Sequence, residues 1–451
     1  MKKNDIFTTE ITSYTSEGMG ICRINDTVVF VPETAAGDII EVRITKVTSS
    51  YAYGRKEKLI KSSEKRVKNI CPVFPRCGGC DFRHISYEEE LSLKKQRVED
   101  VLHRIAGIDL SPEMIIGADN IDFYRNKAQF PVRLYNNSPE LGFYRERSHD
   151  IMPIDKCFIQ HECCEGLIKA LKKWMNEFSI EPYDEINGKG VVRHLYTRSS
   201  RKTGDLIVCI VTLTDKLPYK DRLVEYLLNE NENINGIVQC VNKSNGNKVL
   251  GDKYVTLYGE DFIYDYIGDL KFKVSIQSFF QVNTEQAYKL YSKAKEYASL
   301  TGNEDVIDLY CGTGTVGLFM ADKAKSLWGI EIIPEAITDA KLNAELNNIK
   351  NADFTVADVT TLSDNAFNKY TKNTVIFIDP PRKGITDELI DKICGIKPLR
   401  VVYISCDPAT MARDLKGFIK NGYRPENCCA IDMFPRTRHV ETVVLMSRAK
   451  G

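Results

Sequence analysis

The chain has 451 residues, 43% of them apolar and 27% charged, which is typical of a folded globular protein and excludes a fibrous or disordered one. No stretch approaches the roughly 20 apolar residues that a membrane span needs, and no apolar segment follows the two N-terminal lysines, so we expect a cytoplasmic protein without a membrane partner. The formal net charge of zero gives no sign of a polyanionic partner, although a local basic patch is compatible with it.

The first part of the chain, residues 7–60, consists of short alternating apolar runs separated by glycines. Examples are Thr27–Val31 and Ile39–Ile44, with Gly37 between them. This spacing predicts a small antiparallel β-barrel. Its last segment, residues 51–58, interleaves tyrosines with cations, which suits bases stacking and phosphates pairing on a nucleic acid. A solvated strand edge explains that segment equally well.

The second part, residues 61–270, has a mixed pattern. A cysteine cluster comes first, and a charged helical stretch follows from Tyr87 to Ile105. Strands are then expected to carry aromatic and basic residues together in three segments: 124–127, 143–147 and 193–198. Each segment alone is typical of a solvated face, but their recurrence favours a polyanionic partner.

From residue 271 onward, apolar runs alternate with amphipathic stretches. The expected strands are Val306–Tyr310, Leu327–Ile332, Phe354–Ala357, Val375–Ile378 and Val401–Ser405. This order predicts a doubly wound α/β sheet, in which ligands bind beyond the C-terminal ends of the strands.

Residues 308–317 read as a strand, a glycine-rich turn with Gly312 and Gly314, and a helix start. Glu331 ends the next strand, where an acid accepts hydrogen bonds from ribose hydroxyls. The turn by itself fits NAD as well as S-adenosylmethionine. Further acids, Asp358 and Asp379, follow the third and fourth strands, and this combination favours a class I methyltransferase.

Arg382 follows Asp379-Pro380-Pro381, where enzymes that methylate exocyclic amines place an aromatic ring. Methylation at nitrogen is therefore disfavoured, and the thiol of Cys406 at the end of the next strand becomes significant. Carbon 5 of uracil becomes nucleophilic when a thiolate adds to carbon 6, and a base must then remove the carbon-5 proton. Such chemistry requires one cysteine and one base.

Two candidates exist for each of these roles. Cys311 also follows a strand, but it lies within the cofactor loop and is expected to pack beside the cofactor. Residues 436–444 read as the final strand, whose period of two would put Thr437, His439 and Glu441 on one face. A carboxylate that enters an apolar strand indicates a function, with Glu441 as the base, although a surface ion pair explains it equally well. His439 is the alternative.

Five motifs together resemble the RNA uracil-C5 methyltransferases: residues 278–283, 308–317, 379–384, 405–408 and 439–442. They occur in the family's order within the C-terminal 180 or so residues. The resemblance implies that Cys406 is the nucleophile and Glu441 the base. It also implies that the S-adenosylmethionine site is formed by Gln281, Tyr310, Gly312, Gly314, Glu331, Asp358 and Asp379.

The front of the chain extends this resemblance, because residues 1–60 resemble a TRAM domain. Fourteen cysteines in a long cytosolic chain indicate metal ligands, catalytic thiols or buried thiols. Three close thiols with one distant partner suit an iron–sulfur cluster better than zinc. The family implies a [4Fe–4S] cluster at Cys71, Cys77, Cys80 and Cys157. Cys163 and Cys164 are less well matched alternatives to Cys157, and buried thiols without a metal are the disfavoured alternative.

We therefore expect an α/β protein with three domains. These are a TRAM β-barrel (residues 1–60), a central α+β iron–sulfur domain (61–270) and a Rossmann-like class I methyltransferase domain (271–451). The expected activity is methylation of uridine carbon 5 by a monomer acting on a loop or single strand of RNA, with 23S ribosomal RNA as the target. Transfer RNA is the alternative target. A cytosine-C5 enzyme is disfavoured because its Pro-Cys motif is missing from the sequence, and a non-catalytic RNA-binding protein is disfavoured by the joint presence of cysteine, base and cofactor motifs.

Overall fold

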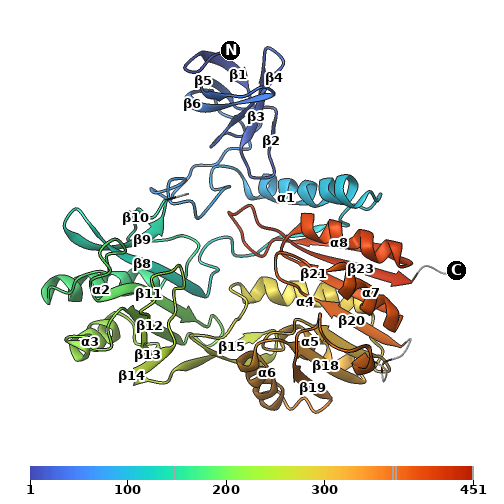
Figure 1. Ribbon diagram of the computed structural model, residues 1–451. Helices are drawn as coiled ribbons and strands as arrows, with labels where there is room; N and C mark the ends of the chain where they lie inside the picture. Colours follow the sequence, from blue (N-terminus) through green and yellow to red (C-terminus); the bar gives the residue numbers. More distant parts are fainter. Residues whose placement is uncertain (146–147, 368–369, 371–372, 449–451) are drawn as a thin grey trace.

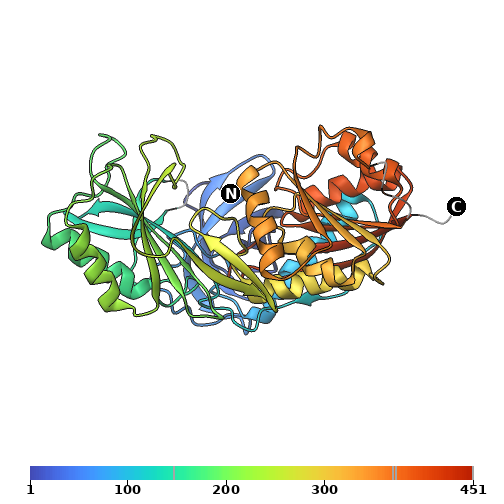
Figure 2. The same cartoon turned by 90° about the horizontal axis from the view of Figure 1, so that it is seen from below.

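The computed structural model describes residues 1–145, 148–367, 370 and 373–448. Figure 1 shows three groups of elements, with a small sheet at the top, a larger sheet with two helices at the left, and a sheet covered by helices at the right. Seen from below, the first sheet lies behind the junction of the other two groups (Figure 2). In the described part of the chain, no helix is long and apolar enough to cross a membrane.

The N-terminal sheet has six strands in the order β1-β5-β6-β4-β3-β2. Its strands are β1 (Ile6–Glu10), β2 (Ser13–Tyr14), β3 (Gly20–Ile24), β4 (Thr27–Val31), β5 (Ile39–Val47) and β6 (Tyr51–Lys61). Inward residues such as Val29 and Val42 form a small core of their own. Three register shifts bend β5 against β6, because an extra residue in one strand increases its twist. The sheet differs from the expected antiparallel barrel in one pairing, since β4 and β6 are parallel.

The central sheet has seven strands in the order β10-β9-β8-β11-β12-β13-β14, and α2 and α3 pack together beside it (Figure 1). Its elements are β8 (Lys127–Tyr135), β9 (Ser138–Tyr144), β10 (Ile151–Pro153), α2 (Cys164–Glu177), β11 (Val192–Ser199), β12 (Leu206–Thr212), α3 (Lys220–Glu230), β13 (Ile234–Val241) and β14 (Lys253–Gly259). A hairpin of β15 (Phe262–Ile267) and β16 (Leu270–Ser275) follows. Of the expected aromatic and basic segments, residues 124–126 precede β8, and residues 146–147 lie outside the described residues.

The third sheet has eight strands in the order β19-β18-β17-β20-β21-β23-β22-β7. Its strands are β17 (Asp305–Leu309), β18 (Ser326–Glu331), β19 (Ala352–Val356), β20 (Thr374–Ile378), β21 (Arg400–Ser405), β22 (Tyr423–Ile431), β23 (Glu441–Arg448) and β7 (Ile115–Ile116). The first five are parallel neighbours, as expected of a doubly wound sheet. Each begins and ends within two residues of its expected bounds.

Helices cover both faces of this sheet. They are α1 (Tyr87–Val101), α4 (Thr284–Ala298), α5 (Thr315–Met320), α6 (Pro334–Leu346), α7 (Asp387–Ile396) and α8 (Pro408–Lys420), with short turns at Leu102–Ala106, Ala321–Lys323 and Asp364–Phe367. Successive strand residues alternate between two cores, so that Val402 and Ile404 enter one and Val401 and Tyr403 the other. This alternation follows from the period of two.

One part of the second segment joins this third sheet. Helix α1 packs against α8, and Ile115 and Ile116 pair in parallel with Ala430 and Ile431 of β22. Residues 87–116 therefore belong structurally to the eight-stranded sheet. No local signal in the sequence indicates this placement, because a two-residue strand carries no periodic pattern.

Candidate active site

Cys406 lies in the turn between β21 and α8, at the C-terminal edge of the sheet. The turn is fixed on both sides of the thiol. The Ser405 hydroxyl donates to the carbonyl of Asp407 at 3.0 Å, and the Asp407 carboxylate caps α8 by accepting from the N–H groups of Ala409 and Thr410. The thiol is half-buried beside the positive end of a helix of 13 residues, which favours an anion.

Glu441 lies opposite Cys406. Strands β21 and β23 are antiparallel, and Ser405 pairs with Thr442, so one more step along each chain brings Cys406 opposite Glu441. The carboxyl group is buried, with 8% of the residue exposed. A buried acid at the end of a hydrophobic strand is costly unless it has a partner or a function.

Electrostatic interactions link these two groups to Asp379 and Arg382. Burial, together with the charges of Glu441 and Asp379, raises the pKa of the Cys406 thiol to about 11, against the opposing effect of a hydrogen bond and the charge from Arg382. Burial also raises the pKa of Glu441 to about 8 and that of Asp379 to about 7. The structure therefore gathers a thiol, two carboxyl groups and one cation at the ends of β20, β21 and β23.

The expected strand from residue 436 is wrong, because β23 begins only at Glu441. Residues 432–440 form a loop in which Arg436 has a φ of +69°. His439 therefore does not share a strand face with Glu441. Its Nδ1 atom lies 3.5 Å from the Arg382 guanidinium, and burial lowers its pKa to about 4.

This loop is held by groups from far earlier in the chain. The N–H groups of Arg436 and Arg438 donate to the carboxylates of Glu90 and Asp81 at 2.7 and 2.8 Å. Beneath the loop, the Lys94 ammonium contacts Glu90 at 2.7 Å and Asp432 at 2.6 Å. Helix α1 thus positions the segment that leads into Glu441.

We expect Lys94→Met to lower the free energy of unfolding by about 3–5 kcal/mol, because it leaves two carboxylates buried without their cation. Lys94 is 1% exposed. Chemical denaturation followed by circular dichroism measures the change. Lys95→Met, on a less buried side of the same helix, should change stability by less than about 0.5 kcal/mol. Equal effects of the two substitutions would contradict the role of the buried ion cluster.

The glycine-rich turn lies at the ends of β17 and β18. Gly312 and Gly314 have φ values of +54° and +81°, which only glycine adopts readily. The Glu331 carboxylate accepts hydrogen bonds from the N–H groups of Gly312, Ile332 and Ile333 at 3.3, 2.8 and 3.0 Å. Ile332 and Ile333 are both more than half exposed and provide an apolar rim beside this acid. A nucleoside fits such a combination of acid and apolar surface.

The other residues expected at this site lie around the turn. Burial raises the pKa of Tyr310 to about 12, and the charges of Asp358 and Glu331 act in the same direction, which is consistent with the three side chains lying near one another. Gln281 hydrogen bonds to Tyr291, and the charge of Asp379 raises the pKa of Tyr291. The site thus runs from Glu331 past Tyr310 and Gln281 to Asp379.

Three further side chains at this edge are not predicted as site residues from the sequence. Tyr291 on α4 bonds to Thr315 at 3.1 Å and reaches Gln281. Phe279, two residues before Gln281, is 70% exposed, which is unusual for a phenylalanine. Arg382 was noticed only as a departure from an aromatic pattern. Cys311, the rival thiol, is buried beneath the turn and 4% exposed.

The cysteines expected to bind a cluster come from two segments that the fold brings near each other. Burial raises the pKa values of Cys80 and Cys77. The charges of Cys77 and Cys157 raise that of Cys80 further, and the charge of Cys71 does the same for Cys77. Cys163 and Cys164 instead hydrogen bond to each other, and Cys164 contacts Thr197. Among the described residues, no group of three or more His, Cys, Asp or Glu side chains is arranged to hold a metal ion.

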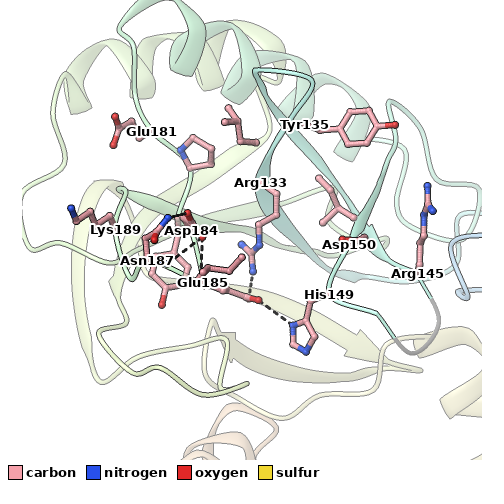
Figure 3. Close-up of a pocket in the computed structure, with 15 residues that line it drawn as sticks. Arg133, Tyr135, Arg145, His149, Asp150, Glu181, Asp184, Glu185, Asn187 and Lys189 are labelled. Atoms are coloured by element: carbon pink, nitrogen blue, oxygen red, sulfur yellow. Dashed lines mark hydrogen bonds and ion pairs between the residues drawn. The ribbon is translucent and has the colours of Figure 1, made fainter.

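A large cavity lies away from these residues, beside β8, β9 and the loop before β11 (Figure 3). It measures about 1030 Å³. Arg133 donates to Glu185, which also contacts Nδ1 of His149 at 3.0 Å. Four acidic and three basic side chains line it, so its charge does not suit a polyanion.

Comparisons with known proteins agree with this geometry. The family described as tRNA (Uracil-5-)-methyltransferase matches residues 86–449, and the TRAM domain matches residues 3–56. Uncharacterized RNA methyltransferases of Clostridium acetobutylicum and Clostridium tetani are 43% and 42% identical, each over 99% of this chain and 98% and 97% of their own lengths.

A solved structure is also similar over the whole fold. It is the Pyrococcus abyssi tRNA (uracil-54, C5)-methyltransferase in complex with S-adenosyl-L-homocysteine, with a TM-score of 0.79 and 28% identity. The match covers 98% of this chain and 100% of that one. The protein therefore belongs to the family of S-adenosylmethionine-dependent RNA uracil-5-methyltransferases and carries an N-terminal TRAM domain.

Proposed function

We propose that this protein methylates carbon 5 of a specific RNA uridine through a covalent bond between Cys406 and carbon 6 of the base. The observation that carries the proposal is the register of β21 and β23, in which Ser405 pairs with Thr442, so that Cys406 and the buried Glu441 follow at neighbouring positions and the charge of Glu441 acts on the pKa of the thiol. Uracil-C5 methylation requires such a pair, because the nucleophile and the base must both reach one ring.

In the proposed reaction, the Cys406 thiolate adds to carbon 6, and the electron pair of the ring's double bond makes carbon 5 nucleophilic. S-adenosylmethionine, when bound, supplies the methyl group that carbon 5 takes. The Glu441 carboxylate then removes the proton from carbon 5, the double bond re-forms, and the thiolate leaves. Arg382 favours the thiolate, since its charge and hydrogen bond oppose the rise in the pKa of Cys406 that burial causes.

The cofactor is proposed to lie along the turn at the ends of β17 and β18. Glu331 would accept hydrogen bonds from the ribose hydroxyls, and Gly312 and Gly314 would let the backbone approach the ligand closely. The remaining contacts would come from Gln281, Tyr310, Asp358 and Asp379. Asp379 would face both the cofactor and the uracil base, because its charge raises the pKa of Cys406 and of Tyr291.

The proposed target is a loop or single-stranded uridine of 23S ribosomal RNA, because the TRAM domain and the cysteine pattern resemble ribosomal members of the family. Such a base is flipped out at a cost of roughly a few kcal/mol, which is smallest where it is unpaired. Transfer RNA is the second candidate. It is favoured by the similarity to the Pyrococcus abyssi enzyme, whose name gives transfer RNA uracil-54 as its substrate.

Trapping with 5-fluorouridine tests both the chemistry and the target. Fluorine at carbon 5 cannot leave as a proton, so a true substrate becomes permanently bound to the protein once the methyl group is transferred. The protein is incubated with S-adenosylmethionine and fluorouridine-containing ribosomal RNA fragments or transfer RNA, and adducts are identified by denaturing gels and mass spectrometry. An adduct with transfer RNA alone would overturn the ribosomal target, and the lack of any adduct would overturn the mechanism.

We also propose that Cys71, Cys77, Cys80 and Cys157 hold a [4Fe–4S] cluster. Mutual effects on the pKa values of these thiols support their proximity, and Arg83, which hydrogen bonds to Cys80, would offset their negative charge. The cluster would join the segment before α1 to the loop after β10. Iron and sulfide analysis with visible absorption spectroscopy of protein purified without oxygen tests the proposal, and iron-free protein with full RNA affinity would argue against it.

The proposed organisation has three domains, a TRAM domain in residues 1–60, a central domain in 61–270 and a methyltransferase domain in 271–451. Residues 87–116 of the central segment pack on the sheet of the methyltransferase domain. We infer a monomer that acts in the cytoplasm, where its RNA substrates are made. Sedimentation of the purified chain measures the oligomeric state, and a stable dimer would overturn that inference.

The rate of methyl transfer should rise with pH from 6 to at least 8.5, by up to roughly a hundredfold per unit below pH 8 and roughly tenfold per unit above it. Glu441, with a pKa of about 8, must lose its proton to act as a base, and so must Cys406, with a pKa of about 11. Both shifts move the rise in the same direction, toward high pH. The measurement is kcat/KM for methyl transfer, and RNA affinity at each pH is the control for binding. A flat profile would contradict the proposed roles.

A further inference from the structure

One face of the β15–β16 hairpin carries aromatic rings and lysines. Alternate residues of both strands point into the core, among them Ile263, Phe272 and Val274. The others lie half-exposed on the outer side. We define the hairpin face as Phe262, Tyr264, Tyr266, Lys271 and Lys273. Figure 1 labels β15 at the junction of the central and third sheets, and Figure 2 shows the hairpin between them from below.

Each ring of the hairpin face has a lysine beside it. Lys271 Nζ lies 3.7 Å from the centroid of the Tyr264 ring, and Lys273 Nζ lies 4.1 Å from that of Phe262. The third ring, Tyr266, has Lys202 Nζ at 4.6 Å. The rings restrict where the ammonium groups can be, so less side-chain entropy is lost when a ligand binds them.

The lysine beside Tyr266, Lys202, lies 3.9 Å from the carboxylate of Asp269 in the hairpin turn. In the part of the chain that the structure describes, neither Lys271 nor Lys273 has an ion-pair partner. The carboxylate of Asp265 on β15 is buried and accepts from Ser200 at 2.9 Å. The charge of Lys273 acts on the pKa of Asp339, but the Asp339 carboxylate makes its hydrogen bond with Ser278 and not with the lysine. The hairpin face therefore presents positive charge to solvent.

The hairpin is held rigidly and continues into the active site. The N–H groups of Lys271 and Lys273 donate to the side chains of Asn347 and Asn343 on α6, at 2.8 and 3.1 Å. Beyond the end of β16, Ser278 follows within three residues, and the chain then reaches Gln281. A strand of RNA that leaves the active site over this segment would meet the hairpin face next.

We propose that the hairpin face binds single-stranded RNA that flanks the methylated uridine, with lysines on phosphates and rings against bases. Aromatic rings interleaved with cations are the pattern of surfaces that bind single strands, because every base has a face that can stack. A protein partner would need acidic groups to match these lysines, whereas RNA supplies a phosphate at every nucleotide. The inference rests on the proposed function for the identity of the flanking strand.

Binding of fluorescent single-stranded oligouridine to the full-length protein tests this inference and does not require methyl transfer. Tyr264→Ala and Tyr266→Ala should each weaken binding roughly tenfold, since a lost stack removes about one such factor. Lys271→Gln with Lys273→Gln should also reduce the slope of log Kd against log salt by about 1.4, since each phosphate contact on a single strand contributes about 0.7.

Matched controls use residues far from the hairpin. Tyr135→Ala replaces an exposed tyrosine at the β8–β9 turn, and Lys220→Gln an exposed lysine at the start of α3. Both should bind like the unmodified protein, and circular dichroism checks the fold of every variant. Equal binding by the hairpin variants and the controls would overturn the inference. If the hairpin variants lose binding but no RNA is ever methylated, the RNA-binding face stands and the proposed function fails.

Discussion

Cys406→Ala should lose methyl transfer by at least roughly 10⁴-fold and form no adduct with fluorouridine RNA. Without the thiol, carbon 5 of the base stays unreactive toward the methyl donor, whereas binding of RNA and cofactor needs no covalent bond. The RNA affinity should therefore stay within about twofold of the unmodified protein. Radiolabelled methyl transfer and adduct formation on denaturing gels measure the two effects.

Two other cysteines provide the controls. Cys394→Ala removes a buried thiol from the last turn of α7, within the hydrophobic core, and should keep both activity and adduct formation. Cys311→Ala tests the rival nucleophile. If the adduct disappears in Cys311→Ala and persists in Cys406→Ala, the roles of the two thiols must be exchanged.

Glu441→Gln should lower turnover by about 10²–10⁴-fold and accumulate a covalent complex with ordinary RNA that contains no fluorine. An amide cannot take the carbon-5 proton, so addition and methyl transfer still proceed but release of the thiol does not. Glutamine also keeps the size of the side chain, which is buried opposite Cys406. Mass spectrometry should find RNA attached to Cys406 with the methyl group already on the base.

Glu426→Gln, an exposed acid on β22, is the matched control and should turn over normally without a complex. His439→Asn tests the alternative base, because the lowered pKa of His439 keeps that ring neutral and able to accept a proton at pH 7. Accumulation of the complex in His439→Asn, with normal turnover in Glu441→Gln, would assign the proton transfer to His439.

Much of the catalytic sheet follows from the sequence alone. Buried parallel strands are continuous apolar runs, so β17 to β21 could be placed within two residues of their observed bounds. The glycine turn at Gly312 and Gly314 and the thiol of Cys406 follow from the same pattern, because each directly succeeds such a run. Ligands of a doubly wound sheet bind at the C-terminal ends of its strands, irrespective of the conformation of the loops.

Only the tertiary structure decides how Glu441 comes to lie near Cys406. Local pattern extends the last strand back to residue 436, but Glu90 and Asp81 hold the N–H groups of Arg436 and Arg438 in a loop, from about 350 residues away. The same packing buries Lys94, which a charged helical stretch presents as an ordinary surface residue. The antiparallel register that sets Glu441 opposite Cys406 likewise depends on pairing between distant strands. Sequence periodicity determines which residues share a strand face, whereas the choice of neighbouring strand and buried partner depends on the free energy of the whole fold.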